Sequence, residues 1–180
     1  MRKAIAIFSA LCLGLILVVV ITHAQMDKSN RPSPPATATL DLGGGQSITI
    51  DYSSPRAKGR KIFGGLVPYG KPWRAGANEA TTFVNTVDVS VGGAIVPAGH
   101  YTLFVIPEES KWTLIISKKT GEWGIPYPGQ SEDLARAEMK VSKTSSPVEN
   151  FTISLDKTGK GGTLTMEWEN TRASVPILKK

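Results

Sequence analysis

Apolar and polar residues alternate with a period of two along most of this chain. In residues 47–52, for example, Ile48 and Ile50 share one face of an extended segment. Successive side chains of a strand point to opposite faces, so this pattern is typical of strands with one buried face. The other alternating or strongly apolar segments are residues 81–91, 101–106, 112–117, 137–141, 151–155, 164–168 and 173–177.

Turn residues separate these segments. Gly92 and Gly93 follow one segment, residues 107–110 form a short polar loop, and residues 156–162 are a glycine-rich turn. Eight or nine short strands spaced in this way predict an all-β fold, an antiparallel two-sheet β-sandwich that is jelly-roll-like and forms a single domain over residues 39–180. At most one short helix is expected, over residues 131–138, a segment that also fits the approach to a strand. The expected core comprises Phe83, Leu103, Leu114, Phe151, Ile153, Leu164, Met166, Trp168 and Val175.

The N-terminal residues have a different pattern. Arg2 and Lys3 precede an uncharged stretch, residues 4–24, which ends in the small residues around Ala24. This is the form of a secretory signal peptide cleaved after Ala24. Its apolar run of about 18 residues also touches the lower limit for a membrane span, so an uncleaved anchor in the inner membrane is the alternative. Residues 25–38 are polar and proline-rich, and we expect a flexible tether there.

Composition narrows the chemistry. The 180-residue chain holds one cysteine, Cys12, and two histidines, and cleavage would leave only His100. Too few ligands remain for a zinc finger, an iron–sulfur cluster or a three-histidine metal site, so no metal or cofactor is expected. The net charge of +6 is spread without a basic run, which argues against a nucleic-acid footprint. His100, at the start of a strand, is interpreted as an exposed edge residue, and no catalytic residue is assigned.

Residues 53–82 form the longest segment without strand alternation. The segment carries six basic residues and a single acid, Glu79. Long irregular segments in compact β domains usually bind something or wrap a sheet edge. Arg74 has the planar donor fork that suits a carboxylate, phosphate or sulfate. If the segment has only a structural role, Arg74 pairs with Glu79 and the pair fixes the loop. We expect these two side chains to lie within salt-bridge reach of each other, with Asn78 at the turn between them.

The four tryptophans divide into two pairs. Trp112 and Trp168 occupy inward positions of predicted strands and are expected in the core. Trp73 and Trp123 lie in loops rich in glycine and proline. Each of these two either closes one end of the sandwich or forms a platform for a ligand, and we expect both near the same end.

The segment from Val67 to Thr81, with its WRAGANEAT stretch, closely resembles the signature of the bacterial domain of unknown function 2911 family. Flanking matches extend the resemblance over about residues 36–178. The resemblance implies an exported, mostly β protein and carries no assigned activity, substrate or cofactor. The resemblance singles out polar and aromatic positions of the motif. Lys71 lies in the same loop and is added to them. The candidate ligand-binding residues are Tyr69, Lys71, Trp73, Arg74, Asn78, Glu79 and Trp123.

Three functions remain open. The first is a non-enzymatic exported binding module, periplasmic or extracellular, for a small polar or anionic molecule or an envelope protein. The second is a structural envelope protein whose motif only organises its loop. The third is an enzyme that uses Glu79 as acid or base and Arg74 to stabilise negative charge, although glycosidase chemistry would want a second carboxylate. Contact with a membrane is expected only if the N-terminal segment is uncleaved.

Overall fold

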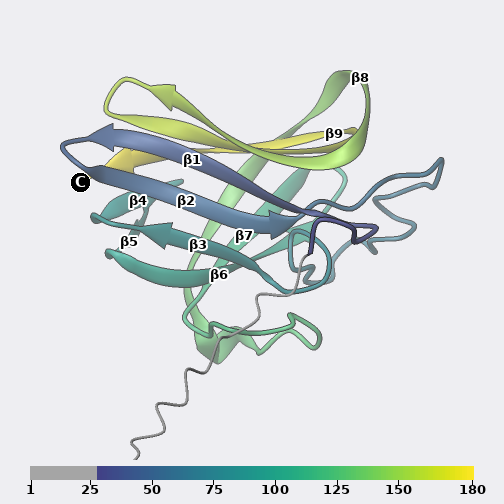
Figure 1. The fold of residues 1–180 in the computed structure, drawn as a ribbon, viewed down its shortest axis with the longest axis horizontal. Helices are drawn as coiled ribbons and strands as arrows, with labels where there is room; N and C mark the ends of the chain where they lie inside the picture. The colour runs from purple at the N-terminus through teal and green to yellow at the C-terminus, as the bar shows by residue number, and fades with distance from the viewer. Residues whose placement is uncertain (1–27) are drawn as a thin grey trace, which may run out of the picture.

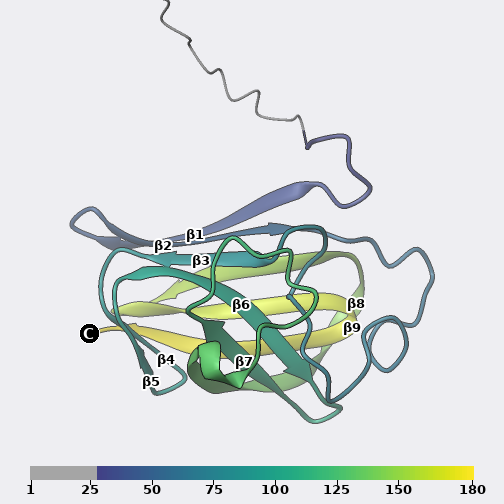
Figure 2. The same ribbon diagram turned by 90° about the horizontal axis from the view of Figure 1, so that it is seen from below.

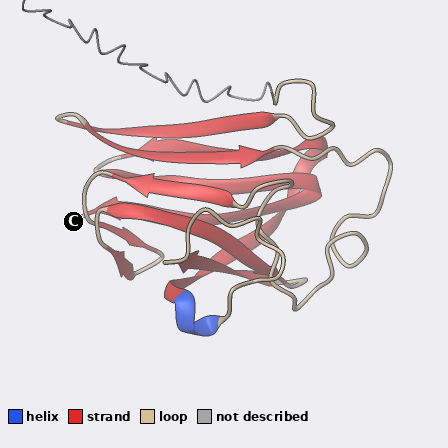
Figure 3. Ribbon diagram, turned by 60° about the horizontal axis from the view of Figure 1, so that its bottom comes forward, coloured by secondary structure: helices blue, strands red, loops and turns tan. Residues whose placement is uncertain are grey.

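The computed structural model describes residues 28–180, so the expected signal peptide, with Cys12 and its cleavage position, lies outside the described residues. Nine strands and one short 3₁₀ turn make up the described chain (Figures 1 and 3). They are β1 (Pro35–Gly43), β2 (Gln46–Ser53), β3 (Thr81–Asn85), β4 (Val89–Val91), β5 (Ala94–Val96), β6 (Gly99–Pro107), β7 (Lys111–Ser117), the turn η1 (Gln130–Glu132), β8 (Asp133–Thr158) and β9 (Gly161–Lys179). Within residues 28–180, no helix has the length and apolar character needed to cross a membrane.

All strands join one antiparallel sheet in the order β1-β2-β3-β6-β7-β8-β9-β4-β5. The all-β prediction is therefore confirmed. A division into two separate sheets is not, because a continuous series of hydrogen-bonded neighbours connects the first strand to the last. The period of two identifies half-buried strands, but it does not say which strands share hydrogen bonds.

The long β8–β9 hairpin explains this continuity. Its pairing register shifts on both sides of Val148, and Glu169, opposite Val148, has a left-handed backbone (φ 54°). Such irregularities bend a hairpin. The first part of β8 pairs with β7, whereas its last part pairs only with the start of β9. One hairpin thus accounts for four of the segments predicted as separate strands.

A second set of contacts joins the chain after β2 to the middle of β8. Phe151 N donates to Pro55 O (2.8 Å), and Ala57 N donates to Glu149 O (2.8 Å). Ser54 Oγ also donates to Phe151 O (2.7 Å). The beginning of the sheet and the bent hairpin are therefore held together, and both contribute to one core.

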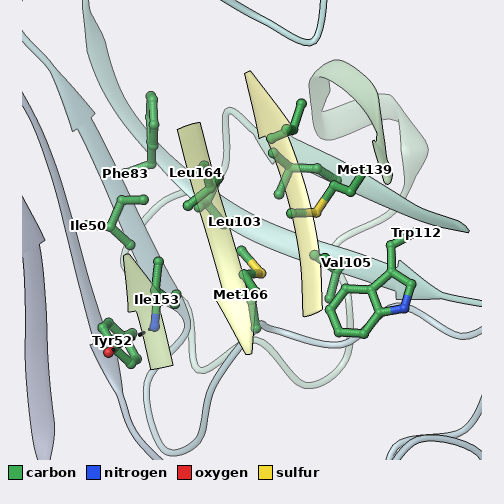
Figure 4. Packing of buried hydrophobic residues seen from close by; sticks show 14 of the residues in the cluster. Ile50, Tyr52, Phe83, Leu103, Val105, Trp112, Met139, Ile153, Leu164 and Met166 are labelled. Atoms are coloured by element: carbon green, nitrogen blue, oxygen red, sulfur yellow. Dashed lines mark hydrogen bonds between the residues drawn. The ribbon is translucent and has the colours of Figure 1, made fainter. Parts of the chain in front are cut away.

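All nine residues predicted for the core are buried. Figure 4 shows Ile50, Phe83, Leu103, Leu164 and Met166 packed together inside the sheet. At the edge of this cluster the hydroxyl of Tyr52 accepts a hydrogen bond from Ile153 N (3.0 Å; dashed in Figure 4).

Several boundaries differ from the sequence-based expectation. Pro35 to Ala38, assigned to the tether, belong to β1, where Ala38 is buried. Alanine is a weak marker of a buried face, so the alternation of β1 is faint. Residues 81–91 divide into β3 and β4, and residues 131–138 form the η1 turn followed by the start of β8.

Candidate functional site

The segment between β2 and β3 folds back onto one end of the sheet. Ile62, Phe63, Val67 and Ala75 are buried in the core, so this irregular segment has apolar anchors of its own. In Figures 1 and 2 it projects at the right, while the C-terminus lies at the opposite end.

Trp73 fixes the segment to β6. Its backbone exchanges two hydrogen bonds with Val105, each of 2.8 Å. The half-buried indole stacks on Trp168 (centroids 5.8 Å apart, planes at 19°), and its Nε1 donates to Gly76 O (3.0 Å). Trp73 therefore closes this end of the core, and its exposed part lines an adjacent pocket.

A pocket of about 390 Å³ opens beside Trp73; we call it the Arg74 pocket. Of the predicted site residues it brings together Lys71, Trp73 and Arg74. The remaining lining is mainly apolar: Pro55, Leu66, Val67, Pro68, Pro72, Gly76, Ala77, Gly124, Ile125 and Trp168.

The mouth of this pocket exposes large apolar side chains. Leu66 is 48% exposed and Ile125 is 69% exposed. Trp123, next to the pocket lining, is 54% exposed. Isolated exposed apolar residues are ordinary on a protein surface, but a group around a concave site is typical of ligand contact.

Arg74 is a partly buried charged residue of this loop. Its Nη1 donates to Trp123 O (3.2 Å), and its guanidinium carbon lies 5.8 Å from the centroid of the Trp123 ring. Its Nε is buried without a hydrogen-bond partner among the described residues. Desolvation lowers the pKa of Arg74, and the negative charge of Glu79 opposes that shift. The arginine thus has no ion-pair partner within residues 28–180, and its Nε donor is left without a hydrogen bond there.

Gly124 allows this arrangement. Its backbone is left-handed (φ +85°), and an added Cβ would lie 2.9 Å from the Cβ atoms of Arg74 and Ala80. A side chain at position 124 would therefore push Arg74 out of place. Close packing is the physical reason for glycine at this position.

The expected Arg74–Glu79 ion pair is wrong. The carboxylate of Glu79 instead contacts Lys28 Nζ (2.9 Å) and Arg31 Nη1 (2.9 Å). These partners lie in the stretch expected to be a tether. Hydrogen bonds from the Lys28 side chain, then from the backbone and from Arg31, together lower the pKa of Glu79 to about 2, against the opposing effect of desolvation.

Asn78 also faces the N-terminal stretch. Its Nδ2 donates to Ser33 O (3.0 Å), and its backbone is left-handed (φ 56°). Asn78 and Glu79 together fasten residues 28–33 to the loop and take no part in lining the Arg74 pocket. Local charge counting could not identify Lys28 and Arg31, because they come from outside the segment.

Tyr69 lies apart from the pocket as well. It lines a separate hollow with Glu108, Glu109 and Trp112, and burial, then the charges of Glu109 and Glu169, raises its pKa. The seven candidates therefore occupy three places: the Arg74 pocket with its neighbour Trp123, the junction of Asn78 and Glu79 with the N-terminal stretch, and the hollow at Tyr69. Sequence reasoning did not identify Leu66 and Ile125, which have no alternation to mark them.

Residues 28–180 contain no group of three or more histidine, cysteine, aspartate or glutamate side chains arranged to hold a metal ion. His100 is exposed on β6 and pairs through its backbone with Val84.

The family comparison agrees with the motif residues described above. The model of a family of proteins of unknown function, DUF2911, matches residues 33–177, so this chain belongs to the DUF2911 family. No curated protein and no solved structure matches the chain.

Proposed function

We propose that this chain is an exported, non-enzymatic binding protein that holds a small ligand in the Arg74 pocket. The ligand carries an anionic group, which Arg74 binds, and an apolar body, which lies against Trp73 and the mouth residues. The observation that supports this most is the buried, unpartnered Nε of Arg74 beside a mainly apolar pocket.

The energetics favour an anion there. A buried donor without a partner is destabilising by about 1–3 kcal/mol, and a partly desolvated cation gains most when an opposite charge reaches it. Arginine binds carboxylates and phosphates through two parallel hydrogen bonds. Nη1 is already engaged with Trp123 O and Nε has almost no solvent exposure, so the ligand is expected to approach Nη2 first and to reach Nε by displacing the groups that cover it.

The structural alternative rests on Asn78 and Glu79. Both side chains hold residues 28–33 against the loop, which is what a motif that only organises its loop would do. An enzymatic role for Glu79 has less support. The Arg74 pocket lining does not include it, and a carboxyl with a pKa of about 2 stays ionised near neutral pH and is a poor general acid.

Export is the remaining part of the proposal. The basic start, apolar run and small residues before Gln25 support a periplasmic or extracellular location, with retention in the inner membrane through residues 4–24 as the alternative.

A thermal-shift screen tests the binding proposal. Small carboxylates and phosphates with aliphatic or aromatic bodies are added to the protein, with neutral amides of the same bodies as matched controls. A ligand that binds the folded state raises the melting temperature by mass action. We expect shifts from acids whose amides give none. If the acids and their amides shift the protein equally, or neither does, the anion-binding proposal fails.

A further inference from the structure

Four lysines surround a second concavity, far from the Arg74 pocket. Lys157 lies at the end of β8 and Lys160 in the β8–β9 turn, while Lys179 ends β9 and Lys180 follows it. With Leu42, Gly159 and Gly161 they line a hollow of about 540 Å³, which we call the lysine hollow. In Figures 1 and 2 the C-terminus marks this end, opposite the loop that carries Arg74.

The backbone brings these lysines together. Lys179 N donates to Lys160 O (3.3 Å), and Lys180 N donates to Asp88 O (3.0 Å). Gly161, the first residue of β9, packs so closely on the far end of the same strand that an added Cβ would overlap the carbonyl oxygen of Ile177. The bend in the β8–β9 hairpin thus places its turn directly against the end of β9, and the four lysines line one concavity.

Among residues 28–180, none of the four lysines forms an ion pair. The nearby carboxylates of Asp41, Asp88 and Asp156 keep their negative charge, but they accept hydrogen bonds from Gly43 N (2.7 Å), Ala98 N (2.8 Å) and Ser154 Oγ (3.1 Å) and contact none of the four ammonium groups within ion-pair distance. Like charges in one concavity repel and create a positive potential that attracts anions.

We propose that the lysine hollow binds a phosphate-bearing ligand with more than one negative charge. Lysine ammonium groups are compact point charges that suit phosphate without demanding the flat geometry of a carboxylate. The concavity lets several of them reach the same group, and glycines at the turn leave room for close approach. Within residues 28–180 no aromatic side chain lines the hollow, so that part of the chain offers no platform there for stacked bases. The phosphates come either from a soluble polyphosphate or from lipid headgroups.

The test compares two double variants of the chain. Lys157→Gln with Lys160→Gln removes two charges from the hollow. Lys140→Gln with Lys143→Gln removes two charges from exposed positions on β8 that do not line it. Inorganic tripolyphosphate is titrated calorimetrically at about 50 mM and about 300 mM NaCl, since screening shortens the reach of charges. In parallel, the proteins are sedimented with phosphatidylglycerol vesicles, and phosphatidylcholine vesicles account for any binding by the apolar N-terminal residues.

We expect tripolyphosphate to bind the unaltered chain, with an affinity that falls at higher salt. The hollow variant should bind at least tenfold more weakly, and the control variant within about twofold of the unaltered chain, at matched melting temperatures. Binding to tripolyphosphate alone supports the proposal and assigns a soluble source. Vesicle binding that tripolyphosphate displaces supports it and assigns lipid headgroups. Equal losses in both variants, or no binding to either probe, would overturn it.

Discussion

The guanidinium of Arg74 lies over the ring of Trp123, 5.8 Å from its centroid, and also donates a hydrogen bond to the carbonyl oxygen of the same residue. Two loops far apart in the sequence therefore meet at one arginine. The contact orients Arg74 beside the pocket while leaving its Nε unpartnered. Its geometry depends on the absence of a side chain at the next residue, Gly124.

Gly124→Ala should displace Arg74 and destabilise the fold by about 1–3 kcal/mol, because the new methyl group would meet the Cβ atoms of Arg74 and Ala80 at 2.9 Å. Gly121→Ala is the matched control. Gly121 also has a left-handed backbone (φ +72°), but nothing lies within 4 Å of an added Cβ. Chemical denaturation should show the larger loss for Gly124→Ala. Equal losses would mean that backbone strain alone is responsible.

Glu79→Gln should lower stability near neutral pH by about 1 kcal/mol or less, since 40% of the Glu79 side chain is exposed and its ion pairs are partly screened. Folding lowers the pKa of Glu79 from 4.5 to about 2. The stabilisation by the carboxylate is therefore complete above pH 4.5 and is lost as the pH falls towards 2.

The measurement is the free energy of unfolding of the unaltered chain and of Glu79→Gln between pH 7 and pH 2. The difference between them should shrink across that window. Glu138→Gln is the control, because it removes an exposed partner of Lys111 with a longer contact of 3.5 Å. A difference for Glu79→Gln that stays constant with pH would show that the ion pairs with Lys28 and Arg31 do not stabilise the fold.

Leu164→Ala should cost about 2–5 kcal/mol, because Leu164 is fully buried where β9 faces the core and its loss leaves a cavity. Leu178→Ala, at an exposed position on the same strand, should cost less than about 0.5 kcal/mol. Urea denaturation of the two variants gives the comparison. Similar small losses would contradict the assigned inward face of β9.

The N-terminus provides a separate test of export. Sequencing of the protein recovered from its native host should begin at Gln25, because signal peptidase reads the small residues before that position. The cleaved protein should also be recovered in the soluble fraction. A chain that begins at Met1 and remains in the membrane pellet would establish the anchor instead.

Much of the fold was accessible from residue alternation, because a period of two identifies half-buried strands and their inward faces. Phe151 and Leu164, for instance, were assigned correctly to the core. Alternation could not reveal that the bend at Val148 and Glu169 joins four predicted segments into one hairpin, since that depends on pairing register.

The site was less predictable for a related reason. Arg74 and Lys71 were identified by type and indeed share a pocket. The partner of Glu79 was predicted wrongly, because ion pairing depends on distance in space, and Lys28 and Arg31 reach it from a stretch with no packing signal. Leu66 and Ile125 became apparent only when folding placed them together at the mouth of the pocket.

Arg74 is proposed to bind the anionic group of a ligand in its pocket. The most direct measurement is calorimetric titration of the acid that gives the largest thermal shift into the unaltered chain and Arg74→Gln. The substitution removes the positive charge. It should change the free energy of unfolding by about 1 kcal/mol or less, since the Arg74 side chain makes one hydrogen bond and one ring contact. We predict at least a tenfold rise in Kd for Arg74→Gln. An unchanged Kd, with both proteins equally folded, would contradict the claim.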